Sequence, residues 1–230
     1  MDSGRIVNEE QGQVGTAVAV AAAPLNVEVW FDLICPWCLI GKRQFELALA
    51  EFRRLHPRRE VAVHWRSQPL LPDIPPQGLP FHEFYLRRLG SAQAVAARQA
   101  QVSAAASKVG LDFNFSTIAS MPNTRAAHAL IADAQAQCDA GTVDALVEEL
   151  FAAHFMRGMN LDDGELLDAL ARRHGITRCD AAPAFPPVAS GVPLFVANRS
   201  HALSGAQPPQ RLLAMMLSAV RPNACDSPVR

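Results

Sequence analysis

Two cysteines, Cys35 and Cys38 in the sequence Cys-Pro-Trp-Cys, stand at the start of a segment that reads as a helix. Residues three apart on a helix lie on one face, so the two sulfurs come within reach of a disulfide bond. A zinc site or an inert disulfide is the structural alternative. The chain has no second Cys-x-x-Cys pair and its seven histidines are scattered, so zinc lacks ligands and the pair favours reversible thiol–disulfide chemistry.

The position of the pair at a helix start predicts different roles for its two thiols. Pro36 suits the first helical position, which places Cys35 at the N-cap. Unpaired backbone N–H groups and the positive end of the helix dipole then favour the Cys35 thiolate, so we expect Cys35 to be the nucleophile. Cys38, one turn into the helix, is expected to be the shielded, resolving thiol. Trp37 either shapes the apolar surface beside the sulfurs or is an ordinary aromatic residue on the helix surface.

The segments around the dithiol predict half of a doubly wound α/β sheet. Residues 27–33 alternate and are rich in β-branched and aromatic side chains, as in a strand. Apolar residues recur at helical spacing from Cys38 to Leu55, and residues 61–66 form a second expected strand. A strand–helix–strand unit of this kind is expected to be parallel and right-handed.

A proline-rich stretch separates this unit from a helical block. Residues 69–80 hold five prolines and one glycine, which predicts an irregular linker. Residues 81–174 then read as helices with no strand between them, and we interpret residues 71–174 as a helical insertion. The expected helices cover residues 81–89, 91–109, 124–138, 143–157 and 163–174.

The C-terminal part is expected to complete the sheet. Residues 176–190 contain three prolines and predict a loop, after which residues 194–197 and 202–203 flank a turn as a short antiparallel hairpin. Two prolines open a final amphipathic helix that runs to about Val220. The expected organisation is a disordered leader at residues 1–24, one discontinuous domain from residues 25–70 and 175–222, and a tail at residues 223–230.

Composition excludes several classes of protein. Half of the 230 residues are hydrophobic and the net charge is −1, so nothing favours nucleic-acid binding. No apolar run reaches the roughly 18 to 20 residues of a membrane span. Residues 14–23 resemble the core of a signal peptide but lack a basic start, and five cysteines, three of them isolated, fit a reducing compartment. We predict a cytoplasmic protein that does not bind membranes, with export as the alternative.

Five short motifs carry a family resemblance. They are Asp32-Leu33-Ile34-Cys35-Pro36-Trp37-Cys38-Leu39-Ile40-Gly41, Asn123-Thr124-Arg125-Ala126-Ala127-His128, Leu150-Phe151-Ala152-Ala153-His154-Phe155, Ser190-Gly191-Val192-Pro193 and Leu203-Ser204-Gly205-Ala206-Gln207. In this order they resemble the DsbA family of thioredoxin-like oxidoreductases, and within it the FrnE-like branch, from about residue 26 to residue 220. The resemblance implies an α/β, thioredoxin-like fold with an inserted all-helical domain. It also implies that Cys35 attacks, that Cys38 resolves, and that Pro193 lies in the cis form against the dithiol.

The same resemblance implies the partners of the site. Substrates would be disulfide-containing proteins or low-molecular-weight thiols, with glutathione as a candidate co-substrate. No metal and no cofactor beyond the redox-active disulfide is expected. Val192, the residue before the proline that the family holds in the cis form, would offer its backbone to an extended substrate segment. Whether the protein forms a homodimer stays open.

The chain departs from the family at the buried acid. Many thioredoxin-like proteins carry an acid six residues before the nucleophilic cysteine, where it helps proton transfer from the second thiol, and here that position is Val29. Glu28 and Asp32 are the nearest substitutes. His128 and His154 lie on expected helices, and we interpret both as hydrogen-bonded structural histidines.

Two other functions stay open. The sequence also resembles 2-hydroxychromene-2-carboxylate isomerases and kappa-class glutathione transferases, which typically have serine at the position of Cys35 and act with glutathione. A binding module or chaperone that uses the helical surface is the third hypothesis. Cys138 and Cys179 are expected to be ordinary small residues, whereas Cys225 lies in the tail and could exchange with Cys35.

Overall fold

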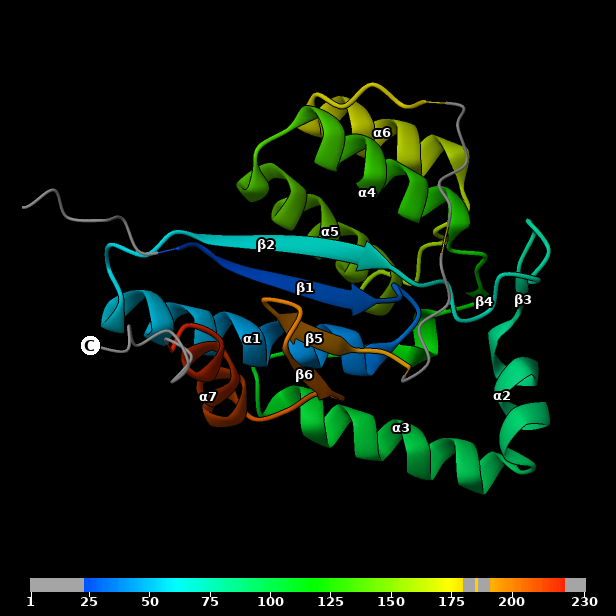
Figure 1. Cartoon of the computed structure of the whole chain (residues 1–230). Coiled ribbons are helices and arrows are strands. Elements are labelled where there is room, and N and C mark those ends of the chain that lie inside the picture. Colours follow the sequence, from blue (N-terminus) through cyan, green and yellow to red (C-terminus); the bar gives the residue numbers. More distant parts are fainter. Residues whose placement is uncertain (1–22, 180–184, 186–190, 222–230) are drawn as a thin grey trace, which may run out of the picture.

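A mixed four-stranded sheet in the order β2-β1-β5-β6 lies at the centre of the computed structural model, which describes residues 23–179, 185 and 191–221 (Figure 1). β1 (Leu25–Phe31) pairs in parallel with β2 (Val61–Ser67) and antiparallel with β5 (Leu194–Ala197). β6 (His201–Ser204) adds to β5 as a hairpin. The expected α/β class, the parallel unit and the antiparallel hairpin are confirmed.

β1 begins and ends two residues earlier than the expected strand at 27–33. The chain turns at Asp32, whose carbonyl accepts a hydrogen bond from the Cys35 amide at 3.1 Å. This turn carries the backbone from the strand into α1 (Pro36–Leu55), so the last residues of the apolar run form the turn and not the ladder. The dithiol therefore lies at the carboxyl end of a central strand.

Helices cover the face of the sheet that carries Val29 and Phe31. These residues are 2 % and 1 % exposed, and they share a face because every second residue of a strand points the same way. α1 reaches this face through Phe45, whose ring lies 5.5 Å from that of Phe195 on β5. α7 (Pro209–Ala219) packs against α1, and Figure 1 shows the two helices side by side next to the sheet.

The helical block also reaches this face, and its helices lie where the sequence predicts them. They are α2 (Phe81–Leu89), α3 (Ala92–Ser107), α4 (Arg125–Gln137), α5 (Ala140–Phe155) and α6 (Gly164–His174), with a 3₁₀ turn at Phe115–Thr117. The Phe151 ring of α5 lies 5.9 Å from that of Phe31. α5 begins three residues earlier than expected, because the Asp139 carboxylate caps it by accepting hydrogen bonds from the amides of Gly141 and Thr142.

Two short strands contradict the expectation of an irregular linker and of a helical block without strands. β3 (Leu79–Pro80) pairs antiparallel with β4 (Ser120–Met121). The Asn123 side chain, just after β4, also binds the segment before β3, since its amide donates to the carbonyls of Pro72 and Ile74 at 3.3 and 2.5 Å. Strands of two residues show no alternation, so a sequence pattern cannot reveal them.

Several expected features lie outside the described residues. They are the leader up to residue 22, the proline-rich loop at 180–184 and 186–190, and the tail from residue 222, which includes Cys225. The division into a discontinuous domain and an insertion stays a prediction. Within the described ranges no helix combines the length and the apolar composition needed to cross a bilayer.

Candidate active site

The structure places Cys35 at the N-cap of α1, as the sequence predicts. Its backbone is extended, with φ −92° and ψ 107°, and Pro36 begins the helix. The Cys38 amide donates to the Cys35 carbonyl at 2.9 Å, so the second thiol lies one turn further along. Both thiols are free, and 8 % of Cys35 but only 3 % of Cys38 is exposed. The more exposed cysteine is thus the one at the helix N-terminus, where a thiolate is favoured.

The loop before β5 brings Val192 and Pro193 to the dithiol. The peptide bond between them is cis, as the resemblance implies, and Sγ of Cys35 lies 4.0 Å from the Val192 carbonyl oxygen. Gly41 on α1 allows this approach, because a Cβ there would lie 3.1 Å from Cγ of Pro193 and 3.3 Å from Cζ of Phe195. A backbone carbonyl from a distant part of the chain therefore faces the expected attacking sulfur.

Cys38 is held in its protonated form. Burial raises the pKa of the Cys38 thiol well above its usual value, and a hydrogen bond with Cys35 and the negative charges of Cys35 and Asp32 act in the same direction. Together these effects outweigh a backbone hydrogen bond at Asp32 that lowers the pKa. Because only a thiolate is nucleophilic, Cys38 needs a base before it can attack another sulfur.

Asp32 is the buried acid beside Cys38. The residue is fully buried, its Oδ2 accepts a hydrogen bond from the Leu70 amide at 2.7 Å, and its Oδ1 lies 3.1 Å from Nε2 of His128. The other substitute for the missing acid, Glu28, is half-exposed and pairs with an arginine of β2 at 2.6 Å. Of the two, only Asp32 is placed to act on the dithiol.

His128 brings the helical block into the site. It lies on α4, is fully buried, and packs between two aromatic rings, with ring centroids 5.2 Å from Phe31 and 5.9 Å from Phe185. Its Nε2 contacts Asp32, which confirms the expected hydrogen bond, while its Nδ1 has no hydrogen-bond partner among the described residues. The sequence marks this histidine only through its place in the motif that begins at Asn123.

His154 is buried like His128 but has no comparable partner. Neither ring nitrogen forms a hydrogen bond of standard geometry in the described part of the chain, although a backbone hydrogen bond with Met159 acts to raise its pKa. Burial lowers the pKa of His154 to about 4, since a cation would be desolvated within the buried face of α5. His154 is therefore neutral at physiological pH and belongs to the core.

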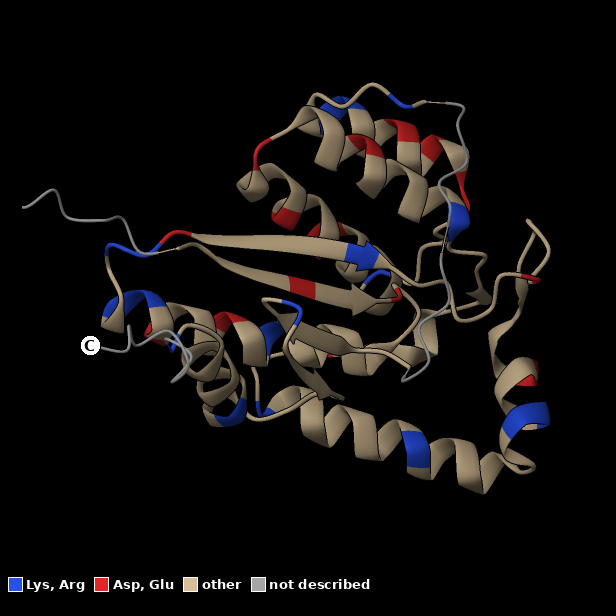
Figure 2. Ribbon diagram, in the orientation of Figure 1, with Lys and Arg blue, Asp and Glu red and all other residues tan. Residues whose placement is uncertain are grey.

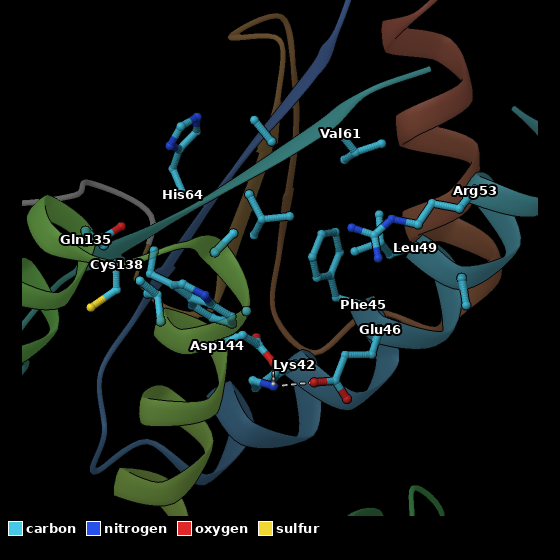
Figure 3. A pocket seen from close by; sticks show the side chains of 17 residues that line it. Lys42, Phe45, Glu46, Leu49, Arg53, Val61, His64, Gln135, Cys138 and Asp144 are labelled. Carbon is cyan, nitrogen blue, oxygen red and sulfur yellow. Dashed lines mark hydrogen bonds and ion pairs between the residues drawn. The ribbon is translucent and has the colours of Figure 1, made fainter. Parts of the chain in front are cut away.

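A pocket of about 530 Å³ lies between α1, β2, the end of α4 and the start of α5 (Figure 3), and neither thiol of the dithiol lines it. Lys42 at its edge is 1 % exposed and pairs with Glu46, and with Asp144 and Glu148 at 3.1 and 3.3 Å. Burial alone would lower the pKa of Lys42, but the hydrogen bond to Glu46 and the three carboxylate charges raise it. The charged Lys42 therefore ties α1 to α5, which is a structural role.

The two other cysteines that the structure describes, Cys138 and Cys179, lie outside α1. Cys138 is half-buried at the C-terminal end of α4 and lines the pocket of Figure 3. Cys179 is exposed, and its amide donates to the Asp133 carboxylate at 3.0 Å. Among the residues that the structure describes, no three His, Cys, Asp or Glu side chains are grouped as they would be around a metal ion.

A central strand that leads into a dithiol at a helix N-terminus, with a cis-proline loop beside it, defines a thioredoxin-like protein. Residues 26–186 match the family of the DSBA-like thioredoxin domain, and the chain belongs to this family. This confirms the resemblance drawn from the motifs.

The chain is also similar to known proteins in sequence and in structure. The chain is 26 % identical over 152 residues to the uncharacterized protein YwbO of Bacillus subtilis, which is 66 % of this chain and 67 % of that one. Its structure is similar to that of a probable DsbA oxidoreductase from Streptomyces coelicolor, with a TM-score of 0.69, 27 % identity and coverage of 85 % and 89 % of the two chains. It shares its fold with the cytosolic disulfide reductase DsbM from Pseudomonas aeruginosa with GSH, with a TM-score of 0.53, 14 % identity and coverage of 84 % and 98 %.

Proposed function

We propose that this protein is a thiol–disulfide oxidoreductase whose dithiol exchanges with the disulfides of proteins or of low-molecular-weight thiols. The observation that carries the proposal is the pair of free thiols at the start of α1, in which Cys38 is the more buried and Cys35 faces the Val192 carbonyl at 4.0 Å. A two-step exchange needs an attacking thiolate, which the helix N-terminus favours at Cys35, and a second thiol that stays protonated until it is needed, which is Cys38.

The exchange proceeds through a mixed disulfide. The Cys35 thiolate attacks one sulfur of the substrate disulfide, whose S–S bond breaks, and the other substrate sulfur leaves as a thiolate. Cys38 then loses its proton and attacks the Cys35 sulfur, which releases the second substrate thiolate and leaves a Cys35–Cys38 disulfide. Two electrons pass from the dithiol to the substrate, and the reverse sequence oxidises a substrate dithiol.

We assign Asp32 as the general base that accepts the proton of Cys38. Its charge acts on Cys38, and the described hydrogen-bond partners of its carboxylate are the Leu70 amide and the His128 ring, neither of them a lysine or an arginine. A carboxylate in this position can accept the proton as Cys38 attacks, directly or through one water. His128 acts as a positioning residue, because it holds Oδ1 of this carboxylate.

The substrate surface is formed by Trp37 and Val192. Both are half-buried, and the backbone at Val192 can pair with an extended segment that carries the substrate cysteine. DsbM, a protein of the same fold with GSH in its structure, supports glutathione as a co-substrate here. The proposal includes no cofactor beyond the redox-active disulfide, and the cytoplasmic location stays a prediction.

The order of attack tests the proposal. Cys38→Ser and Cys35→Ser are each incubated with a protein disulfide and with oxidised glutathione, and covalent adducts are measured by intact mass. Cys38→Ser should accumulate a mixed disulfide at Cys35 because the resolving thiol is gone, whereas Cys35→Ser should accumulate few adducts or none. Cys138→Ser is the control, since this thiol lies outside the dithiol and should change neither result.

Two outcomes would contradict this assignment. Adducts that form equally at both cysteines of the pair, or mainly at Cys225, would show that the dithiol does not work as nucleophile and resolver. Isomerase or transferase turnover with glutathione that survives Cys38→Ser would favour the glutathione-dependent alternative, because that chemistry does not need a resolving thiol.

A further inference from the structure

A second pocket, of about 250 Å³, borders the dithiol segment directly. Pro36 and Trp37 form one part of its wall, and α2 and α3 form most of the rest. Its interior is aromatic, since the Phe81 ring lies 4.9 Å from the Tyr85 ring and 6.5 Å from the Phe115 ring. A side chain that enters this pocket lies beside the two residues that separate the cysteines.

Two arginines stand at this pocket without carboxylate partners. Arg88 of α2 and Arg98 of α3 are both exposed, and neither forms an ion pair in the described part of the chain. Figure 2 shows basic segments on both helices and no acidic segment along α3, in which Arg98 is the one charged residue. The described residues that line the pocket include no Asp or Glu. We refer to it as the Arg88–Arg98 pocket.

Tyr85 connects the Arg88–Arg98 pocket with the attacking thiol. Burial raises the pKa of Tyr85, the charge of Cys35 raises it further, and Arg88 and Arg98 oppose the rise. The tyrosine, both arginines and the thiol therefore interact electrostatically across one small volume. The Tyr85 hydroxyl has no hydrogen-bond partner among the described residues, so it is available to donate to a ligand oxygen.

We infer that the Arg88–Arg98 pocket selects peptide disulfides that carry an acidic side chain close to the substrate cysteine. The inference rests on the proposed function, since a substrate whose sulfur is bonded to Cys35 has its neighbouring residues close to Pro36 and Trp37, which line this pocket. Guanidinium groups bind carboxylates by charge-assisted and often bidentate hydrogen bonds. The aromatic side chains that line the pocket offer an apolar surface to the aliphatic part of a glutamate side chain.

The test compares three peptide disulfides that differ in one residue beside the cysteine, which is Glu, Gln or Lys. The measured quantity is kcat/KM for the reduction of each peptide by the full chain. At low salt we expect the Glu peptide to exceed the Gln peptide by roughly fivefold to tenfold, and the Lys peptide to be the poorest. High salt should reduce the preference, because exposed charges are screened.

Charge variants of the pocket provide the second arm. The double variant Arg88→Gln/Arg98→Gln should bring the Glu-to-Gln ratio to about one, and Arg88→Glu/Arg98→Glu should reverse the preference toward the Lys peptide. Arg87→Gln is the matched control, because Arg87 is exposed on the same helix but does not line the pocket. It should keep the wild-type ratio. Each ratio is taken within one variant, so a general loss of folding does not imitate a change in preference.

The outcomes distinguish a failure of the inference from a failure of the proposed function. Equal rates for the Glu and Gln peptides in the wild type, or a preference that persists in the double Gln variant, overturn the inference and leave the proposed function intact. A wild-type protein that reduces oxidised glutathione but none of the peptides overturns the inference alone, and one that reduces neither overturns the proposed function itself. Turnover of oxidised glutathione is measured with the same variants. If the double Gln variant loses this turnover but keeps the wild-type Glu-to-Gln ratio of kcat/KM, the pocket binds glutathione and the peptide assignment is overturned.

Discussion

Replacing Asp32 with asparagine should slow the second step of the exchange and leave the first almost unchanged. Asparagine keeps the shape of the side chain, and its oxygen can still accept the hydrogen bond that the Leu70 amide makes at 2.7 Å, but it cannot take up a proton. A positioned general base contributes about 10²-fold to 10⁴-fold in rate, or ~3 to 5 kcal/mol. Cys38 is the thiol that depends on this base, because burial raises its pKa.

The effect of Asp32→Asn depends on pH with a defined sign. In the proposed mechanism, Asp32 of the wild type removes the Cys38 proton at neutral pH. In the variant only hydroxide or buffer removes it, so the rate of resolution should rise with pH into the alkaline range in which a thiol of raised pKa ionises. The difference between the two proteins should therefore be largest at neutral pH and should shrink as the pH increases.

The assay is a single turnover stopped with acid and analysed by intact mass. The mixed disulfide at Cys35 should accumulate in Asp32→Asn and stay at low levels in the wild type. Glu28→Gln is the matched control, because Glu28 pairs with Arg66 on the partly exposed face of the sheet. A wild-type rate of resolution in Asp32→Asn, or an equal loss in Glu28→Gln, would refute the assignment of Asp32 as the proton acceptor.

Two further predictions concern stability. Gly41→Ala should lower the free energy of unfolding by about 1 to 3 kcal/mol, because the new Cβ would press on Pro193 and Phe195. Thermal melts measure the loss. Gly164→Ala is the control and should show no such loss, because nothing lies within 4 Å of a Cβ there. As the pH falls from 7 to 5, protonation of His154 in the unfolded chain should lower the free energy of unfolding by about 2 kcal/mol. The reason is that His154 has a pKa of about 4 in the folded chain, where it stays neutral, but about 6.5 when unfolded. Urea unfolding of His154→Leu should lack this part of the pH dependence, and an unchanged slope would contradict the prediction.

The immediate surroundings of the dithiol follow from local sequence. Pro36 and the helical spacing after it predict the N-cap position of Cys35, and the order strand, helix, strand predicts the parallel pairing of β1 with β2. The limits of α6 follow from Asp163, whose side chain caps the first turn, and from Gly175, which ends the helix in the left-handed conformation. The N-cap and the limits of α6 depend on residues within a few positions of one another, which is why a sequence pattern reveals them. The pairing of β1 with β2 joins distant residues, but it follows from the regular topology of strand–helix–strand units.

Only the tertiary structure decided which of the two acids serves the dithiol and which distant polar groups meet it. Asp32 and His128 are 96 residues apart in the chain, and Cys35 and the Val192 carbonyl are 157 residues apart. His128 and His154 are both fully buried on neighbouring helices, yet only His128 meets a carboxylate. The repeat of apolar residues predicts which face of a helix is buried, but the polar groups that meet there are set by how the helical block packs against the end of β1.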